Sequence, residues 1–514
     1  MSQTRSWTKE PGSDEAIKRT VLIASILGSG IVFLDQTIVN VALPAIRSSL
    51  NGSLAEQQWV VEAYLLTLSS LLLLGGSLGD VLGRRRVFQT GLIGFGVCSL
   101  VCAAAPNSEV LIAARGMQGV AGALLVPSSL ALILETFGEG ERAAAIGTWT
   151  AWTGIATVIG PLGGGLLVQA ASWRWIFLIN PIPVVITVLL LQRLEPDRRA
   201  PGRVDWVGGV LCVLGLGGTV FGLIEHSVYG WDDPRVFVPL IAGILLIVAF
   251  LTWERRVPEP MMPLELFAVR NFAVGNVTTL AMYGGLGVAT FFLVVFLQQV
   301  AGYTPLASGL ALLPITLVMF TLSRRFGRLA DRFGPRLFMS GGPFLAGVGL
   351  LLLTRITAHP DYLTTILPAV LVFALGLAAT VAPLTAAVLG SVEPGKSGVA
   401  SGANNAVARI AGLLAIAAVG AVVSASFVSR LDHDLARTPS AEPAIAAART
   451  RPLVTNSPGL PHVVLVDASV HAFRIGVAIA GVLAILGGLI SLLGIENPPR
   501  RGSLAAPWQS QSHT

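Results

Sequence analysis

The chain has 514 residues, of which 53% are hydrophobic and only 12% are charged. Soluble domains carry about 25% charged residues, so this composition excludes a soluble globular protein and leaves room for many apolar helices that each cross a bilayer. The formal net charge of +6 comes from arginines gathered in a few short loops, which indicates membrane topology rather than a nucleic-acid partner.

Fourteen apolar runs, each long enough to form a membrane-spanning helix, follow one another along the chain. The first six are 20–44, 57–79, 87–105, 110–135, 143–170 and 174–192. Two more, 205–225 and 236–253, occupy the middle of the chain. The last six are 272–300, 306–325, 336–354, 363–390, 399–427 and 471–495.

This order predicts an all-α membrane protein with six-helix bundles at 20–192 and 272–495 and two additional helices within 205–253. Linkers at 193–204 and 254–271, both expected in the cytoplasm, separate the three parts. Arginines cluster in alternate loops, for example at 84–86 and 324–336, and the positive-inside rule places these loops in the cytoplasm of a bacterial cell. The tails 1–19 and 496–514 then also lie in the cytoplasm, and the long segment 428–470 lies outside.

Two acids interrupt the first two spans. Asp35 lies well inside the first, in the segment LDQTIVNVALP (34–44), and Glu62 lies nearer the outer end of the second, in WVVEAY (59–64). A carboxylate at membrane depth costs about 2.5 kcal/mol or more, and a low dielectric favours its protonated form. Either acid is therefore suited to carry a proton or to bind a cation; the structural alternative is a carboxylate that is paired or solvated at a helix end.

A short pattern at the inner end of the second span recurs in the second half of the chain. It reads GSLGDVLGR at 76–84 and GRLADRFGP at 327–335, each time in a charged break between two apolar runs. Two equivalent hinges in two equivalent halves are typical of an internally repeated transporter. Asp80 or Asp331 can pair with nearby arginines or a helix N-terminus, although each hinge could also be a simple capped turn. Because Pro335 replaces Arg84 in the second copy, we expect the pairing that holds the second hinge in one conformation to be weaker.

The fourth span carries a cation and several glycines in the segment RGMQGVAGA (115–123). Arg115, Gly119 and Gly122 share one helix face, where the glycines allow another helix to approach closely. A buried guanidinium needs a carboxylate partner, and Asp35 and Glu62 are the candidates.

The fifth span contains Gly154 and the run GPLGGG (160–165). Proline removes a backbone hydrogen bond and glycines permit bending, so the run predicts either a functional bend or a close-packing seam. The following segment WRWIFLINP (173–181) is interpreted as an interfacial anchor rather than as a site.

Arg409 is a cation within the thirteenth span, after Asn404 and Asn405. It could bind an anionic group of a substrate or pair with an acid such as Glu225, and we favour the pairing. Asn40 and Gln118 are further polar residues expected to line the interior.

These motifs resemble those of the major facilitator superfamily, and within it the fourteen-span drug:proton antiporters. The resemblance covers nearly the whole chain and implies the major facilitator fold. It implies a transporter that exports drugs or other lipophilic compounds across the cytoplasmic membrane by alternating access, driven by protons and without a cofactor. We expect cationic substrates, because a carboxylate in a low dielectric attracts cations strongly, and we expect a monomer. The implied proton-coupling or substrate residues are Asp35, Glu62 and Arg115. The implied bend residues are Gly154, Gly160, Pro161 and Gly164, and the implied gating residues are Gly76, Asp80, Gly83, Arg84, Asp331 and Gly334.

Other functions remain open at this level. The chain could export a single metabolite, such as an antibiotic, amino acid or siderophore. It could instead be a membrane receptor or sensor, with a ligand bound by 428–470. An enzyme is not expected, because the spans hold no metal-binding His/Glu pair or Ser/His arrangement, and the scattered cysteines and histidines predict no metal site. The segment GSVEPGKS (390–397) matches a phosphate-binding loop formally, but it lacks the preceding strand, so no nucleotide partner is expected.

Overall fold

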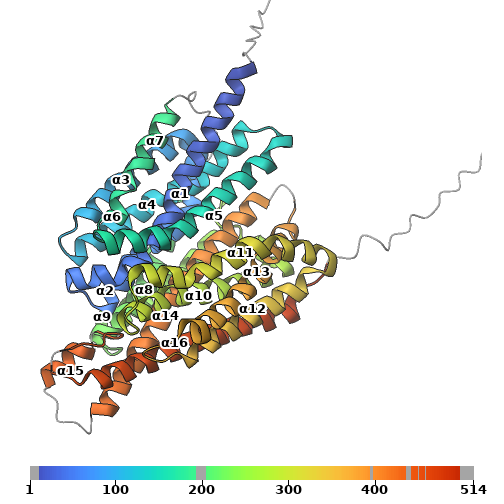
Figure 1. Ribbon diagram of the computed structural model, residues 1–514. Coiled ribbons are helices and arrows are strands. Elements are labelled where there is room, and N and C mark those ends of the chain that lie inside the picture. The colour runs from blue at the N-terminus through green and yellow to red at the C-terminus, as the bar shows by residue number, and fades with distance from the viewer. Residues whose placement is uncertain are drawn as a thin grey trace, which may run out of the picture.

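The structure, a computed structural model, describes residues 11–192, 204–393, 397–435, 442–449, 451–457 and 459–497. Every regular element in these ranges is helical, which confirms the all-α prediction. Thirteen of the described helices are long and apolar enough to cross a membrane. Apart from a middle pair, these helices belong to two bundles that lie side by side, the blue-to-teal one above and the yellow-to-red one below in Figure 1.

The first bundle contains α1 (Pro11–Leu50), α2 (Leu54–Leu82), α3 (Arg84–Ala104), α4 (Ser108–Thr136), α5 (Glu139–Ala170), α6 (Trp175–Leu178) and α7 (Pro181–Leu191). The middle pair is α8 (Trp206–Tyr229) and α9 (Pro234–Glu254). The second bundle contains the short helix η1 (Leu264–Ala268), α10 (Arg270–Gln299), α11 (Pro305–Phe333), α12 (Pro335–Leu352), η2 (Leu353–Arg355), η3 (Tyr362–Ile366), α13 (Leu367–Gly390), α14 (Ser397–Leu435), α15 (Glu442–Arg449) and α16 (His462–Gly494).

The two bundles repeat the same internal packing. In the first, α2 and α3 pack on α4, α1 packs on α5, and α7 packs on α1 and α3. In the second, α11 and α12 pack on α13, α10 packs on α14, and α16 packs on α10 and α12. The bundles meet where α5 contacts α11 and α2 contacts α14, a pair of contacts related by the same repeat.

The sixth predicted span is shorter than expected. Residues Trp175–Leu191 form an apolar stretch that falls below the length of a full span, and it is divided into α6 and α7 around Ile179 and Asn180. The prediction of fourteen full-length spans therefore differs from the structure at this position. The linker 193–203, which follows α7, lies outside the described residues.

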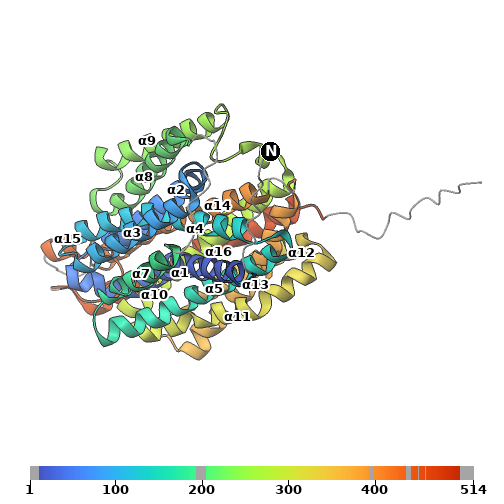
Figure 2. The ribbon, with the colours of Figure 1, turned by 90° about the horizontal axis from the view of Figure 1, so that it is seen from above.

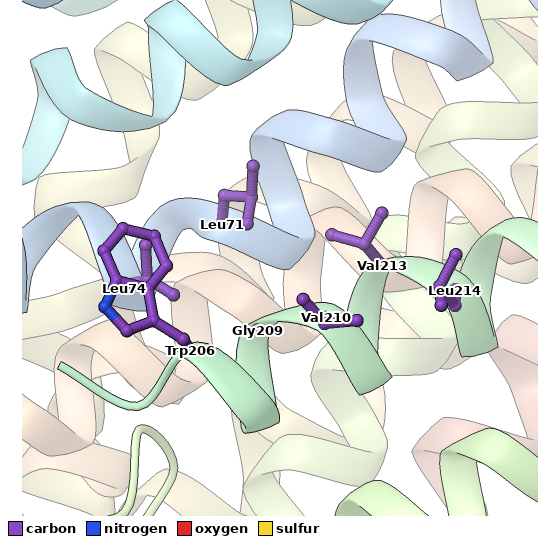
Figure 3. Close-up of a pocket in the computed structure, with 7 residues that line it drawn as sticks. All are labelled: Leu71, Leu74, Trp206, Gly209, Val210, Val213 and Leu214. Atoms are coloured by element: carbon purple, nitrogen blue, oxygen red, sulfur yellow. The ribbon is translucent and has the colours of Figure 1, made fainter.

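The middle pair lies at the periphery of the molecule. Figure 2 shows α8 and α9 along one edge, next to α2, and α8 also contacts α14. An apolar groove between α2 and α8 is lined by Leu71, Leu74, Trp206, Gly209, Val210, Val213 and Leu214 (Figure 3). It holds no charged or amide side chain, so it has the character of a helix–helix groove facing lipid.

Several helices are longer than the hydropathy of the sequence predicts. The first helix begins at Pro11 and ends at Leu50, so part of the predicted tail 1–19 is helical. The expected loop 428–470 is largely helical too, because α14 continues to Leu435, α15 follows, and α16 already begins at His462. Polar residues at both ends of these helices extend them beyond their apolar cores. Residues 1–10 and 498–514 of the predicted tails lie outside the described residues.

We call the ends of the molecule outer and inner by their predicted locations. At the outer end Pro305 and Leu306 of α11 lie against Gly165 of α5. Toward the inner end the two helices are less covered: the buried residues of α11 lie in its outer half, within 308–315, with Ala330 as the exception, and no atom lies within 4 Å of a Cβ added at Gly147 or Gly154 in the inner half of α5. The bundles are therefore closed at the outer end and separated at the inner end along the α5–α11 side, an inward-facing arrangement.

Candidate functional site

Asp35 is the centre of a buried polar network inside the first bundle. Its Oδ2 atom accepts a hydrogen bond from Nη1 of Arg115 on α4, within a buried ion pair. Its Oδ1 atom accepts hydrogen bonds from Nε2 of Gln118 at 3.1 Å and from Nδ2 of Asn180 at 3.2 Å. All four side chains are buried. Of the two acids considered as partners of Arg115, the structure gives Asp35.

Arg115 keeps other acceptors besides Asp35. Its Nε donates to the carbonyl of Val60 at 3.0 Å, its Nη1 donates to Oε1 of Gln118 at 2.7 Å, and its guanidinium lies 4.1 Å from the centre of the Tyr64 ring. The close approach of α4 to α2 depends on Gly119, because a Cβ atom there would collide with the Tyr64 carbonyl. The glycine face predicted for the fourth span therefore positions the arginine.

Asn180 is a site residue that the sequence analysis missed. It lies at the junction of α6 and α7, and its Nδ2 donates to Asp35 and, at 3.1 Å, to Oγ of Ser99 on α3. Its Oδ1 atom is buried without a partner. The segment 173–181 was interpreted as an interfacial anchor and not as a site, but the structure places its asparagine in contact with the buried acid. A polar amide in an otherwise apolar span was the available signal.

Glu62 is separate from this network. Its side chain is fully buried, and neither carboxylate oxygen has a hydrogen-bond partner. It lies one helical turn after Gln58, whose Nε2 donates to the carbonyl of Ile416 on α14 at 3.0 Å, so it shares the face of α2 that packs on the second bundle. No hydrogen bond or ion pair connects it to Asp35 within the described part of the chain.

A second polar set lies between the bundles. Helix α1 contacts helices of both bundles, including α5, α7, α10 and α11. Phe33, Gln36 and Asn40 lie on one face of it and are partly exposed, which we interpret as exposure toward the space between the bundles. Arg409 of α14, also partly exposed, lies opposite. We call these four residues the inter-bundle face.

Arg409 is not paired with Glu225, which corrects the favoured prediction. Its Nη1 donates to Oε1 of Gln36 at 3.3 Å, and its guanidinium lies 5.7 Å from the centre of the Phe33 ring. Glu225 instead accepts a hydrogen bond from the indole of Trp59 at 2.8 Å. Helix α8 lies at the periphery beside α2, and its acid is held there by the indole of Trp59, near the outer end of α8.

Asn404 and Asn405 point in different directions despite being adjacent. Asn404 donates to Asn276 at 3.1 Å and to Thr279 at 2.8 Å, both on α10, and thus holds two helices of the second bundle together. Asn405 is exposed and donates to the carbonyl of Ser401 in its own helix.

The glycine run of α5 forms a packing seam. Gly160 lies against Thr37 and Gly164 against Ile38, both on α1, while the carbonyl of Pro161 would lie 2.5 Å from a Cβ atom added at Gly309 of α11. The helix continues through Pro161 without a break in its assignment. Gly154 differs from the rest, since no atom lies within 4 Å of where its Cβ would be.

The two repeated hinges are similar in backbone and different in side-chain contacts. Both end a helix at a glycine with positive φ, 104° at Gly83 and 90° at Gly334. In the first hinge Arg84 donates to Asp80 at 2.9 Å and to the carbonyl of Ala131 at 3.2 Å, and so ties α2, α3 and α4 together. Gly76 lies nearby against the ring of Pro127.

In the second hinge Asp331 is exposed and makes no ion pair with the described residues. Both hinges lie at the inner end, because α2 and α11 each start at the outer end. The asymmetry agrees with the expectation from Pro335.

The sequence of this chain is similar to those of known membrane transporters. Residues 25–416 match the Major Facilitator Superfamily. The chain is 35% identical over 490 residues to a puromycin resistance protein of Streptomyces alboniger, covering 93% of this chain and 91% of that one. It is also 35% identical to the tetracenomycin C resistance and export protein of Streptomyces glaucescens, over 78% of this chain and 75% of that one. A third relative, the multidrug resistance protein Stp of Mycobacterium tuberculosis, is 35% identical over 81% of this chain and 78% of its own length.

Solved structures support the same fold at lower sequence identity. A bacterial homologue of the human lysosomal transporter Spinster, in an inward-facing conformation, superposes with a TM-score of 0.63 at 17% identity, covering 95% of this chain and all (100%) of that one. A peptide transporter crystallised with sulfate gives a TM-score of 0.60 at 15% identity, with 95% of each chain covered. The family match, the repeated six-helix bundles and these relatives together show that the chain belongs to the Major Facilitator Superfamily of membrane transporters and is not an enzyme.

Proposed function

We propose that this protein exports antibiotics or other lipophilic small molecules across the bacterial cytoplasmic membrane in exchange for protons. Three relatives, each matched by this chain over three quarters or more of the relative's length, are named for antibiotic or drug resistance. One of them is also named for export. The observation that carries the proton coupling is the buried ion pair of Asp35 with Arg115. The proposal also holds that both termini lie in the cytoplasm, at the predicted inner end, and that the chain acts as a monomer.

The network around Asp35 can accept a proton and still keep hydrogen bonds to its buried polar groups. Protonation of Asp35 removes its charge and weakens the ion pair, but Arg115 still donates to Val60 and Gln118. The Asn180 amide can rotate so that its unpartnered Oδ1 accepts the new O–H of Asp35. The positive charge of Arg115 is then uncompensated inside the first bundle, which favours a rearrangement of α1 and α4 relative to each other.

Such a rearrangement is connected to the contact between the bundles. Helix α1 packs through Thr37 and Ile38 on the glycine seam of α5, and α5 closes the outer end against α11. A shift of α1 therefore reaches the outer contact directly. In this mechanism a proton that enters from outside loads Asp35, and its release inside returns the ion pair.

Substrates are proposed to be lipophilic without a requirement for positive charge. The expectation of cationic substrates rested on free acids in the interior. Asp35 is already matched by Arg115, and Glu62 is fully enclosed. Neither carboxylate is exposed to a molecule between the bundles in this conformation.

The test is transport into proteoliposomes with and without a pH gradient, using a panel of anionic, neutral and cationic dyes. Asp35→Asn leaves Arg115 as an unpaired buried charge, so loss of activity by itself does not separate coupling from folding. The double variant Asp35→Asn/Arg115→Gln restores neutrality. If Asp35 carries the proton, the double variant is folded but does not transport against a gradient. Gradient-driven transport by the double variant at the wild-type rate would show that the pair is structural.

A further inference from the structure

We infer that Arg409 recognises an anionic oxygen group, a carboxylate or a phenolate, on the molecule that this transporter exports. The inference rests on the proposed export function and adds the chemical class of the substrate. It also replaces the sequence-based expectation of cations.

Arg409 is a charge without a counter-ion. The other arginine described at this depth, Arg115, has Asp35 as its partner. Arg409 makes no ion pair with any described acid, and its hydrogen bond goes to the neutral amide of Gln36, at a long 3.3 Å. A guanidinium carries five N–H donors in a planar fork, so most of its capacity remains unused.

The unused donors of Arg409 are reachable. Its side chain is partly exposed, and none of its nitrogens is among the buried polar atoms that lack a partner. Because Arg409 lies inside a membrane span and opposite the enclosed helix α1, this exposure is toward the space between the bundles and not toward lipid. Glu62 is the reverse case, an acid that is unpartnered but completely buried. Of these two unpaired charges, the one that a substrate can touch is positive.

The surroundings of Arg409 suit an aromatic acid. A cation within a membrane span is expensive when it has no partner, and a carboxylate or phenolate supplies one through short, charge-assisted hydrogen bonds. Phe33 lies beside the guanidinium and offers a ring for stacking.

Binding at this position also affects the contact between the bundles. The Gln36–Arg409 hydrogen bond joins α1 of the first bundle to α14 of the second. An anion on Arg409 replaces a weak neutral acceptor with a strong charged one, and so releases Gln36. Substrate occupancy is thereby linked to the relative movement of α1 and α14.

The experiment measures binding to the full-length protein in lipid nanodiscs without any gradient. The probes are 2-naphthoate and 4-phenylbenzoate, each compared with its own methyl ester, which keeps the rings and removes the charge. In the wild-type protein at least one carboxylate should bind about tenfold or more tightly than its ester. Arg409→Gln should abolish this preference, and Arg409→Lys, which keeps the charge but loses the fork, should keep part of it.

Two further variants protect the test against misfolding. Gln36→Glu places an acid opposite Arg409 and should lower the preference by occupying the guanidinium. Arg474→Gln removes an arginine of α16 that donates to the carbonyl of Ile356, and it should leave the preference unchanged. The inference is wrong if no carboxylate is preferred to its ester, or if Arg409→Gln and Gln36→Glu both keep the wild-type preference.

The result separates this inference from the proposed function. A charge preference that depends on Arg409, together with transport that ignores the pH gradient, would keep the anion site and reject proton coupling. Proton-driven transport without any charge preference would keep proton coupling and reject the anion site.

Discussion

Arg47, near the outer end of α1, donates a 2.8 Å hydrogen bond to Oε1 of Gln299 at the end of α10, and thereby joins the two bundles across the closed outer end. The same Nη1 atom lies 3.4 Å from the carbonyl of Pro452, in the segment that follows α15. Leu453, the next residue, is fully buried and has a φ of 62°. This part of the outer segment is therefore packed into the outer contact.

Arg47→Ala should weaken the closure of the outer end. Loss of hydrogen bonds from a charged donor costs about 1.5–3 kcal/mol, enough to shift the balance between the two conformations about tenfold or more toward the outward-facing one. The measurement is labelling of a cysteine introduced at Leu312, a buried position on the outer half of α11, by a membrane-impermeant maleimide. Arg174→Ala is the control, because Arg174 is at the same end but donates to Ala105 within its own bundle. Equal labelling in both variants would contradict this role of Arg47.

Gly165→Val should prevent closure of the outer end. A Cβ atom at Gly165 would lie 2.7 Å from Cα of Leu306 and 2.8 Å from the carbonyl oxygen of Pro305, and backbone atoms cannot move aside. The variant should fold, since the clash is between bundles, but it should lose nearly all transport. Gly154→Val is the matched control on the same helix, where no atom lies within 4 Å. Transport rates in proteoliposomes compare the two, and normal transport by Gly165→Val would show that this contact is not needed.

Glu62→Leu and Asp35→Asn should change stability in opposite directions. Both oxygens of Glu62 are buried without a partner, so an apolar replacement removes a desolvation penalty and should stabilise the protein by about 1–3 kcal/mol. Asp35→Asn breaks a buried ion pair and should cost about 3–5 kcal/mol. Thermal unfolding in nanodiscs measures both. If Glu62→Leu lowers the unfolding temperature as much as Asp35→Asn does, Glu62 has a stabilising partner that this conformation does not show.

Asn180→Ala should lower transport while the protein remains folded. The change removes the hydrogen bonds to Asp35 and Ser99, and with them the amide that can accept the proton of a neutral Asp35. Each lost hydrogen bond is worth about 0.5–1.5 kcal/mol, so we expect a decrease in rate of about tenfold. Asn271→Ala, which removes a partly exposed asparagine that donates to the carbonyl of Glu496, should transport normally. Wild-type transport by Asn180→Ala would remove this residue from the proton site.

The span pattern could be predicted from the sequence because it depends on local composition. Thirteen of the predicted spans correspond to helices of full length, and the hinges at Gly83 and Gly334 fall at the predicted breaks. The helix ends could not be predicted as well. In α1 and α14 polar residues continue a helix past its apolar core, and hydropathy does not register them.

The partners of the charged residues were only partly predictable. Arg115 had two candidate acids in the sequence, and the packing of α1 on α4 selected Asp35. Asn180 was overlooked because the aromatic residues around it are typical of a membrane interface. Arg409 was assigned the wrong partner, because the sequence does not reveal that α8 and its Glu225 lie on the outside of α2.

The sequence by itself determined that this chain crosses a membrane in two repeated halves. The length of an apolar run and the spacing of arginines are local properties, and they decide directly whether and in which direction a segment inserts into a bilayer. Only the tertiary structure decided which charge is neutralised and which is left open. That choice depends on distances between side chains far apart in the chain: Asp35 and Arg115 are enclosed together in one bundle, whereas Arg409 faces the other bundle with a neutral amide as its partner.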